Sequence, residues 1–236
     1  MKDESTYCTL CDNTGWVKIQ KEDREVMQKC RCREMDAFLI KSEKANIPKR
    51  FMGAFLDHYY PDKKNPSQND AKKAAQLFVN DYPAVLKGLL LQGPTGVGKT
   101  KLLCAIGSEL IKKIKNVHIY YIDCNDLIRE MRSGDHIQTR DYTYFNRLLH
   151  HLVTVDLLLF DELGAVTTTP WILDNIYYIF NKRYLDNKTT LCASNFLDES
   201  LNGQETLAQR IGERTRSRLY EMAQSMSIKG ADLRRF

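Results

Sequence analysis

The sequence predicts an α/β fold, in which helices cover both faces of a parallel β-sheet. From Lys87 onward, strand-like apolar runs alternate with helical stretches, and near-continuous apolar strands separated by helices are typical of a parallel sheet buried on both faces. The chain has 236 residues, which is enough for one such core and a small appendage. Because 43% of its residues are hydrophobic and 28% are charged, the composition is that of a globular domain rather than a disordered chain.

The N-terminal part of the chain precedes this alternating pattern and is predicted to be a separate unit. Four cysteines fall within 25 residues there. The stretch "CREMDAFLIKSEKANIPKRF" predicts a helix that ends before Pro48, because the residue before a proline disfavours helical backbone. We therefore expect a cysteine module with a linker helix at residues 1–46 and the α/β domain at residues 47–236.

The elements of the α/β domain follow in order. The polar stretch "FLDHYYPDKKNPSQND", interrupted by two prolines, predicts a loop, and "DAKKAAQLFVNDY" predicts the first helix of the domain. Five strands are then expected, at "GLLLQG", "NVHIYYID", "VDLLLFDEL", "TTLCASNF" and the less apolar "SMSIKG". These runs together predict a five-stranded parallel sheet.

A glycine-rich segment follows the first of these strands. Its residues "GPTGVGKT" fit the pattern G-x-x-x-x-G-K-[ST], with a strand before it and a helix after it. Glycines let the backbone turn tightly, so that several N–H groups converge on phosphate oxygens at a helix N-terminus. Lys99 would reach the β- and γ-phosphates, and Thr100 would offer its hydroxyl to Mg²⁺. The expected nucleotide-binding residues are Gly93, Pro94, Thr95, Gly96, Val97, Gly98, Lys99, Thr100 and Lys101.

Polar residues at the ends of two further strands predict the rest of this site. Charges at the carboxyl end of a buried parallel strand lie over the crevice where such sheets bind ligands, which makes Asp161 the candidate for holding Mg²⁺. Strand alternation points Glu162 away from Asp161, and a carboxylate beside the γ-phosphate can orient and deprotonate a water. The amide of Asn195, at the end of the next strand, could position that water or touch the γ-phosphate. The set favours hydrolysis over transfer to a second substrate.

Arginines are spaced regularly near the C-terminus. In "QRIGERTRSRLYEM", Arg210, Arg214 and Arg218 lie four apart and would share one helical face, with Arg216 turned away. Phosphoryl transfer is accelerated by an arginine that reaches the transferring phosphate, from the same chain or from a neighbour. Arg234, in "GADLRRF", is a second candidate for such a role. The alternative interpretation of the row is a solvated helix face.

Five motifs in order give the chain a family resemblance. The phosphate loop, "LLLFDELG", "CASNF", "GERTRSRL" and "SIKGADLRR" make residues 47–236 resemble the AAA+ core, a P-loop NTPase fold, of the bacterial helicase loaders of the DnaC/DnaI group and their transposition relative IstB. The resemblance implies a sheet with strand order 5-1-4-3-2. It also implies that Asn195 is the first sensor, that Arg218 is a finger acting on a neighbour's ATP, and that Arg234 is the second sensor, with Arg214 as the alternative finger.

The same resemblance implies partners. The segment at about residues 127–141 would hold an extra helix whose basic residues face single-stranded DNA, and Arg129, Arg132 and Arg140 are the matching positions. The chain would associate with itself through shared ATP sites and would act on a replicative hexameric helicase. Some loader-like proteins carry an N-terminal domain that grips the helicase, and the cysteine module is the candidate for that grip.

The cysteine module has the residue types of a metal site. Cys8-x2-Cys11 and Cys30-x-Cys32 supply four thiolates from two short loops, close to a zinc-ribbon spacing. A zinc ion held by four thiolates is closed to substrate, so it would serve to fold a segment too small for a core of its own. Because the second pair has one intervening residue where two is usual, unliganded reduced cysteines and an iron–sulfur cluster are the alternatives.

Charge and hydropathy bound the location of the protein. The net charge is +5, and residues 210–236 hold seven basic residues against three acids, which permits nucleic-acid binding without establishing it. No run approaches the roughly 18 apolar residues that cross a bilayer, and the first residues do not resemble a signal peptide. We expect a cytoplasmic protein with no membrane partner.

Four functions fit these patterns. The first is an ATPase that loads a replicative helicase, and the second is an IstB-like, ATP-dependent, DNA-binding regulator of a transposase. A small-molecule kinase would also need a phosphate loop, although Glu162 and the arginine row weigh against it. The last is a binding module with a vestigial ATP site, which is disfavoured because every catalytic position is filled.

Overall fold

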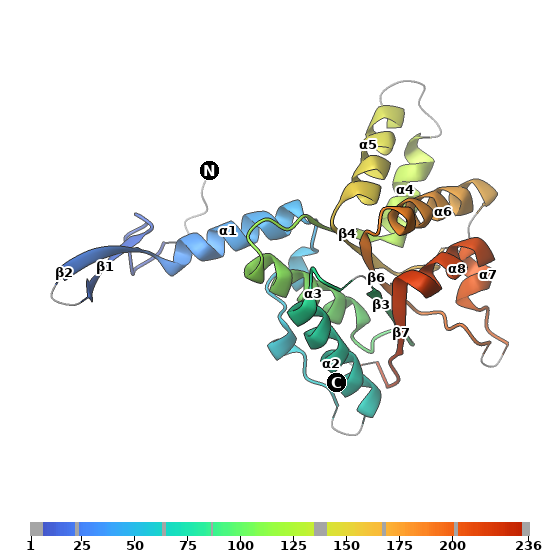
Figure 1. The fold of residues 1–236 in the computed structure, drawn as a ribbon, viewed down its shortest axis with the longest axis horizontal. Coiled ribbons are helices and arrows are strands. Elements are labelled where there is room, and N and C mark those ends of the chain that lie inside the picture. Colours follow the sequence, from blue (N-terminus) through green and yellow to red (C-terminus); the bar gives the residue numbers. More distant parts are fainter. Residues whose placement is uncertain are drawn as a thin grey trace.

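The computed structural model describes residues 7–21, 24–62, 65–85, 87–134, 141–166, 169–200 and 203–232. An α/β body carries a β-hairpin and a helix that extend from one side of it (Figure 1). The strands are β1 (Trp16–Lys21), β2 (Arg24–Lys29), β3 (Gly88–Gln92), β4 (Ile119–Asp123), β5 (Leu157–Asp161), β6 (Thr189–Ser194) and β7 (Ala223–Ser227). The α-helices are α1 (Arg31–Lys44), α2 (Pro66–Asp81), α3 (Lys99–Lys113), α4 (Cys124–Gly134), α5 (Asp141–Thr154), α6 (Pro170–Leu185), α7 (Leu207–Ile211) and α8 (Glu213–Met222), with short 3₁₀ turns at Lys49–Phe51 and Leu56–His58.

Strands β3 to β7 form one parallel sheet. Its spatial order is β4-β5-β6-β3-β7, and every neighbouring pair is parallel. Numbered along the chain within this sheet and taken from the β7 edge, the order is 5-1-4-3-2, so the predicted topology is confirmed. Since β3 lies between β6 and β7, the phosphate loop that follows β3 lies near the ends of both strands.

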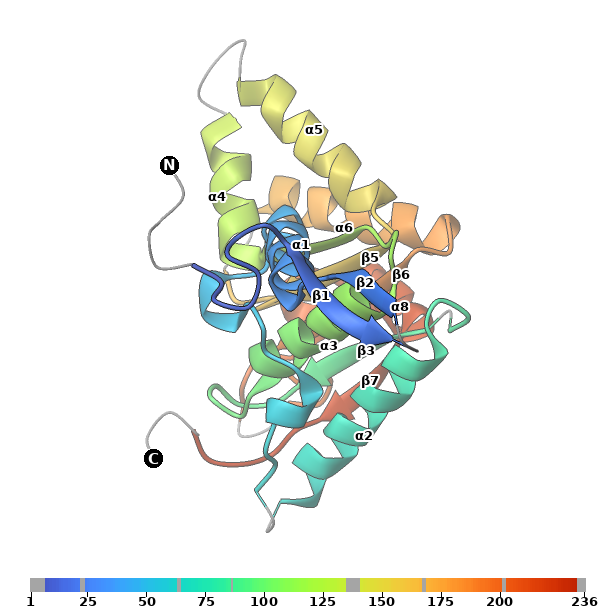
Figure 2. The ribbon, with the colours of Figure 1, turned by 90° about the vertical axis from the view of Figure 1, so that its left-hand side faces the viewer.

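Alternating side chains of the sheet feed two apolar layers. Leu89 and Leu91 pack in one buried cluster with residues of α2 and α3, whereas Leu90 packs in the other with residues of α4 to α8. Figure 2 shows α2 and α3 on one side of the sheet and α4, α5 and α6 on the other. The near-continuous apolar strands of the sequence are explained by this burial on both faces.

The start of one helix differs from the predicted one. Helix α2 begins at Pro66, four residues before the predicted start at Asp70, because proline at the first helical position is already set for helical backbone. The connection between the parallel strands β4 and β5 contains two helices, α4 and α5, although a single helix would be enough to join them. The predicted extra helix at about residues 127–141 overlaps α4, and residues 135–140 lie outside the part of the chain that the structure describes.

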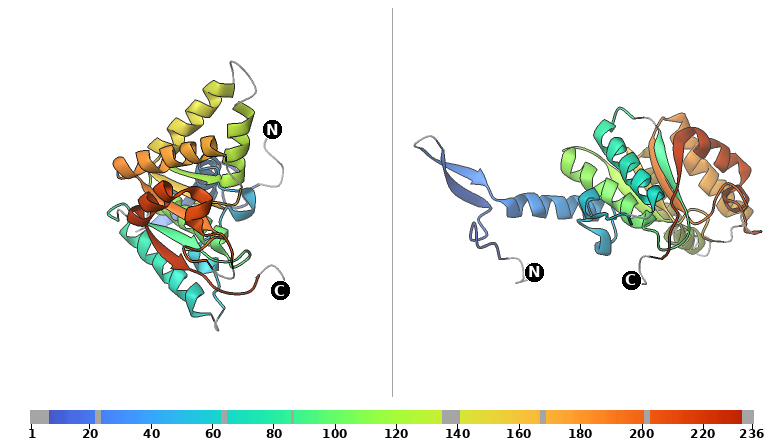
Figure 3. Two further views of the ribbon diagram at one scale, coloured as in Figure 1. Left: turned by 90° about the vertical axis from the view of Figure 1, so that its right-hand side faces the viewer. Right: turned by 90° about the horizontal axis from the view of Figure 1, so that it is seen from below.

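The N-terminal elements project from the body. Strands β1 and β2 pair antiparallel, and α1 joins this hairpin to the α/β body (Figures 1 and 3). The C-terminal end of α1 is anchored, since Ala45 and Ile47 are buried in the same cluster as α3 and the Tyr121 N–H donates to the carbonyl of Ala45 at 2.8 Å. The predicted domain boundary after residue 46 thus falls between two buried residues.

Among the described residues, no helix has the length and apolar character needed to cross a membrane.

Candidate functional site

The glycine-rich loop joins β3 to α3. Gly93, Gly96 and Gly98 have positive φ angles of 152°, 85° and 95°, a region that favours glycine. The loop is also tightly enclosed: a Cβ on Gly93 would lie 2.0 Å from the carbonyl oxygen of Ile228. A Cβ on Gly96 would lie 2.0 Å from Oδ1 of Asp232. The segment after β7 therefore runs directly against the loop.

Lys99 is held inside this loop by three acceptors. Its side chain is buried, and Nζ donates to the carbonyls of Gly93 and Pro94 at 2.8 Å each. Nζ also donates to Oδ1 of Asn195 at 2.7 Å, and Asn195 Nδ2 donates to Oε2 of Glu162 at 2.6 Å. A hydrogen-bonded chain therefore runs from the start of α3 through the end of β6 to the residue after β5.

A second hydrogen-bonded group lies at the end of β5. Asp161 is 2% exposed and accepts hydrogen bonds from the Tyr121 hydroxyl at 2.9 Å and from the Thr100 side chain. Burial raises the pKa of Asp161, although these hydrogen bonds oppose the shift. A carboxylate and a hydroxyl are hard oxygen ligands, so Thr100 and Asp161 together suit Mg²⁺.

Glu162 follows Asp161 in the sequence, but its carboxylate belongs to the hydrogen-bonded chain that contains Lys99 and Asn195. Strand β5 ends at Asp161, and Glu162 has a left-handed backbone with φ of 53°. Burial raises the pKa of Glu162, and the negative charge of Asp161 raises it further. Two crowded carboxylates of this kind, facing a lysine, are typical of a site that binds a cation with an anionic ligand.

Tyr121 was not among the predicted site residues. It lies in β4 within an apolar run, so no local pattern marks its hydroxyl. The one signal available was its position two residues before the end of the predicted strand, close to the carboxyl ends of the strands, where the acidic residues lie. Of the predicted set, Lys101 turns away from the others, and its Nζ donates to the carbonyl of His58 at 2.7 Å.

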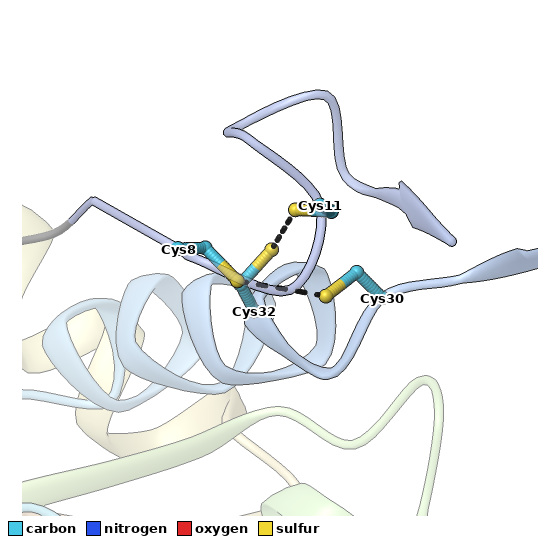
Figure 4. A group of neighbouring side chains, drawn as sticks. All are labelled: Cys8, Cys11, Cys30 and Cys32. Carbon is cyan, nitrogen blue, oxygen red and sulfur yellow. Dashed lines mark hydrogen bonds between the residues drawn. The ribbon is translucent and has the colours of Figure 1, made fainter. Parts of the chain in front are cut away.

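Four cysteines form a second candidate site, between the N-terminal hairpin and the start of α1. Their Sγ atoms all lie within 4.8 Å of one another (Figure 4), with Cys8 to Cys30 at 3.7 Å and Cys11 to Cys32 at 3.5 Å. These separations are too long for disulfides, whose S–S bond is about 2.05 Å. They are close to the S···S edge of about 3.8 Å that a tetrahedral ion with 2.3 Å bonds requires.

The environment of Cys11 favours a thiolate ligand. Burial alone would raise the pKa of this thiol, but the Gly15 N–H, which donates to Cys11 Sγ at 3.3 Å, and the neighbouring thiols lower it to about 7. Gly15 has φ of 75°, as a tight turn after the first cysteine pair requires. The cluster is suited to hold a metal ion.

Comparison with known proteins identifies the family. The family model described as "IstB-like ATP binding protein" matches residues 13–235. This chain belongs to that family. The phage-like element PBSX protein XkdC of Bacillus subtilis (strain 168) is 27% identical over 244 aligned residues, which cover 97% of this chain and 85% of XkdC.

Two further similarities concern helicase loaders. The replicative helicase loader DnaI of the same strain is 30% identical over 149 residues, covering 63% of this chain and 45% of DnaI. A crystal structure of the DnaC helicase loader has a TM-score of 0.64 at 31% identity and covers 77% of this chain and 100% of that one. The IstB-like chain thus has the AAA+ P-loop ATPase fold that its motifs predicted.

The C-terminal arginines of this IstB-like protein are divided between two helices. Gly212, with φ of 82°, separates α7 from α8. The prediction that Arg210 shares a helical face with Arg214 and Arg218 is therefore wrong, because the glycine ends the first helix. Arg210 instead donates through Nε to the carbonyl of Gly164 at 2.8 Å.

The remaining arginines of this row lie on α8. Arg216 turns away from Arg214 and Arg218 and is buried, and its Nε lies 2.5 Å from Asp198 Oδ1. Arg214 and Arg218 both pack against α6, with their guanidinium groups over the rings of Tyr177 and Tyr184.

Four other predicted arginines belong to other parts of the IstB-like chain. Arg234 and Arg140 lie outside the described residues. Arg129 and Arg132 lie on α4, where Arg129 is 3.9 Å from Asp126 and Arg132 is exposed. The DNA-facing role of these arginines stays a prediction.

Proposed function

We propose that this chain is an ATP-hydrolysing helicase loader that acts in DNA replication and places a hexameric replicative helicase on single-stranded DNA. The observation that carries the proposal is the hydrogen-bonded chain from Lys99 through Asn195 to Glu162, beside the Thr100–Asp161 pair. This arrangement has a group for each need of ATP hydrolysis: phosphate binding, metal binding and activation of water. The similarity to DnaI and DnaC supports the choice of partner.

ATP binding would use the loop between Gly93 and Gly98. Backbone N–H groups at the start of α3 would hold the phosphates. Lys99 would exchange its loop carbonyls for β- and γ-phosphate oxygens, because a phosphate is the more strongly charged acceptor. Thr100 and Asp161 would hold Mg²⁺, which when bound neutralises charge on the phosphates.

Hydrolysis would use the residues at the strand ends. Glu162 accepts a proton from the water that attacks the γ-phosphorus, and Asn195, already bonded to both Glu162 and Lys99, holds the base in line with the phosphate. In this proposal Arg218 acts on the ATP of a neighbouring copy and Arg234 acts on its own nucleotide, which makes self-association depend on ATP. The raised pKa of Glu162 suits a base that works near neutral pH.

The N-terminal module would contact the helicase. We assign Zn²⁺ to Cys8, Cys11, Cys30 and Cys32, whose sulfurs all lie within 4.8 Å of one another, since four thiolates are its usual structural ligands. In this proposal residues 1–46 form the grip and residues 47–236 the ATPase. Arg129, Arg132 and Arg140 would face single-stranded DNA.

Three variants test the proposal. Lys99→Ala should weaken ATP binding about 10- to 100-fold, because it removes a charged hydrogen-bond donor to the phosphates. Glu162→Gln should bind ATP normally without turning it over, and it should therefore stay on a helicase and single-stranded DNA complex that the wild type leaves. Lys73→Ala, an exposed lysine on α2, is the matched control and should behave as wild type.

Other results would point elsewhere. Phosphate transferred to a small-molecule acceptor would establish a kinase instead. ATP-dependent stimulation of a transposase, with no binding to the replicative helicase in a pulldown, would establish the transposase regulator. Normal turnover by Glu162→Gln would remove Glu162 from its role as the base.

A further inference from the structure

Three residues of α6 form a stripe that faces two arginines of α8. Tyr177, Asn181 and Tyr184 are spaced four and three apart, so they share one side of the helix. Arg214 lies over Tyr177, with its Cζ 3.9 Å from the ring centroid. Arg218 lies over Tyr184, with its Cζ 4.6 Å from the ring centroid. The two helices thus meet through stacked guanidinium and phenol groups.

Arg218 is held from more than one side. Its Nε donates to Oδ1 of Asn181 at 3.2 Å, and its NH1 lies 3.9 Å from Oε1 of Glu221. The hydroxyl of Tyr184 donates to Oε2 of Glu221 at 2.9 Å, which fixes the carboxylate beside the guanidinium. The ring, the amide and the carboxylate together define one position for the arginine.

The same contacts leave part of the arginine free to reach outward. The Arg218 side chain is 34% exposed, so it is neither buried like Arg216 nor loose in solvent. Asn181 Oδ1 also accepts the Tyr177 hydroxyl at 3.3 Å, which anchors the amide to its own helix. An arginine fixed at its base and exposed in part is the arrangement that a residue acting on another molecule requires.

We propose that Asn181, Tyr184 and Glu221 are positioning residues for Arg218, and that they hold its guanidinium in place for the ATP of a neighbouring copy. The inference rests on the proposed function, in which Arg218 is a finger acting in trans. A long, flexible arginine loses conformational freedom when it engages a phosphate, and a preformed cradle reduces that loss. A misplacement of about 1 Å can slow an enzyme about 100-fold.

The cradle also distinguishes Arg218 from Arg214. Arg218 combines a ring contact with the hydrogen bond to Asn181 and with the nearby carboxylate of Glu221. Arg214 lies close over the ring of Tyr177, and side-chain hydrogen bonds from both arginines lower the pKa of that phenol. The additional contacts with Asn181 and Glu221 therefore assign the finger to Arg218 rather than to Arg214.

The first test removes the amide. Asn181→Ala should lower the kcat of ATP hydrolysis by the assembled protein about 10- to 100-fold, with the dissociation constant for ATP unchanged. Asn175→Ala is the matched control, since Asn175 lies on the same helix and its amide donates to the Trp171 carbonyl of that helix. Tyr184→Phe keeps the ring and its volume, so folding is retained, and it should give a smaller decrease in kcat by freeing Glu221.

Mixing experiments separate positioning from simple packing. Asn181→Ala has an intact phosphate loop, and Lys99→Ala has an intact Arg218 cradle, so an equimolar mixture should regain hydrolysis above the sum of the two separate rates. A packing defect in Asn181→Ala would stay in every copy of that variant, and the mixture would not recover. A slow Asn181→Ala without recovery in the mixture overturns the inference.

The same mixtures distinguish failure of the inference from failure of the proposed function. If Arg218→Ala mixed with Lys99→Ala regains activity while Asn181→Ala and Tyr184→Phe turn over ATP at the wild-type rate, the positioning role is wrong and the trans finger stands. If Arg218→Ala mixed with Lys99→Ala regains nothing, the trans finger is wrong and the inference falls with it.

Discussion

One residue with a left-handed backbone, Glu162, lies in the candidate nucleotide site. Glu162 has φ of 53°, a conformation that is uncommon outside glycine and is often found at functional sites. Strand alternation predicted that Glu162 points away from Asp161, but β5 has already ended at Asp161. The turn, rather than the strand, brings the Glu162 carboxylate to Asn195.

Because Glu162 is partly buried, its negative charge at neutral pH should lower the stability of the folded protein. Its pKa is raised by burial and by Asp161. An acid whose pKa is higher in the folded state stabilises that state at low pH, and the contribution is lost as pH rises through the raised value. Glu162→Gln should therefore raise the Tm of the nucleotide-free protein at pH 7.5, as measured by calorimetry, while it abolishes turnover.

The pH dependence provides the check on that prediction. The difference in Tm between Glu162→Gln and wild type should shrink as pH falls toward the ordinary range of a glutamate, about 4.3, because the wild-type side chain is then also neutral. As the pH is lowered, hydrolysis by the wild type should be lost at a higher pH than a glutamate of ordinary pKa would give, because the base becomes protonated sooner. A Tm difference that is independent of pH would mean that the charge of Glu162 is not its cause.

The site residues that could be predicted from the sequence are those that belong to a motif or follow the end of a strand. Lys99, Thr100, Asp161 and Asn195 were found in this way, and the structure brings them together. Tyr121 and Asn181 were not found. A tyrosine inside an apolar strand and an asparagine on a helix surface have no local signature, since their importance comes from neighbours 40 and 37 residues away in the chain.

At the scale of elements, close strand contact restricts β3, which leads into the phosphate loop. A Cβ on Gly88 would lie 1.8 Å from the carbonyl oxygen of Thr190 in β6. That atom belongs to the backbone, so it does not move aside without parting the strands. The positions of the phosphate loop and of the end of β6, where Asn195 lies, thus depend on a glycine outside the phosphate-loop motif.

Gly88→Ala is expected to destabilise the α/β domain by about 1–3 kcal/mol, the usual cost of overpacking, and to weaken ATP binding as β3 moves. Urea denaturation followed by circular dichroism measures the first effect, and nucleotide titration the second. Lys87→Ala, at the exposed neighbouring position, should change stability by no more than about 0.5 kcal/mol. Equal midpoints for the two variants would show that β3 and β6 tolerate the extra methyl group.

The arginine row shows where element prediction fails. Four-residue spacing from Arg210 to Arg218 predicted one helical face, but Gly212 divides the segment into α7 and α8. The glycine was visible in "RIGER", and helices often end at such a residue. Periodicity alone is therefore a poor guide when it crosses a glycine.

For the whole molecule, the topology of the sheet could be predicted, but the way in which the N-terminal elements join the α/β body could not. Apolar runs predicted the five strands of the parallel sheet but not the hairpin strands β1 and β2, and the family resemblance implied the order of the five. The projection of the hairpin and α1 from the body (Figure 3) has no counterpart in the residue pattern, because it depends on how Ala45 and Ile47 pack against α3. The structure thus joins a body with two apolar layers to a hairpin without a core of its own.

The weak burial of the hairpin predicts that a metal holds it. None of the residues of β1 and β2 is buried, whereas Cys11 and Cys30 are, so a metal ion held by the cysteines would supply the stability that an apolar core does not. We expect about one zinc ion per chain by elemental analysis. Chelation should make the backbone amides of residues 8–32 exchange rapidly with deuterium, while the α/β body keeps its Tm and its ATP binding.

Cys11→Ser supplies the matched comparison, because it removes one ligand without a chelator that could also take Mg²⁺. It should show the same fast exchange in residues 8–32 before chelation and no further change after it, and it should lose binding to the helicase while it still hydrolyses ATP. Loss of the α/β body on chelation would mean that α1 transmits the stability of the hairpin to the sheet. A chain that purifies with iron, or with no metal and a protected hairpin, would contradict the zinc assignment.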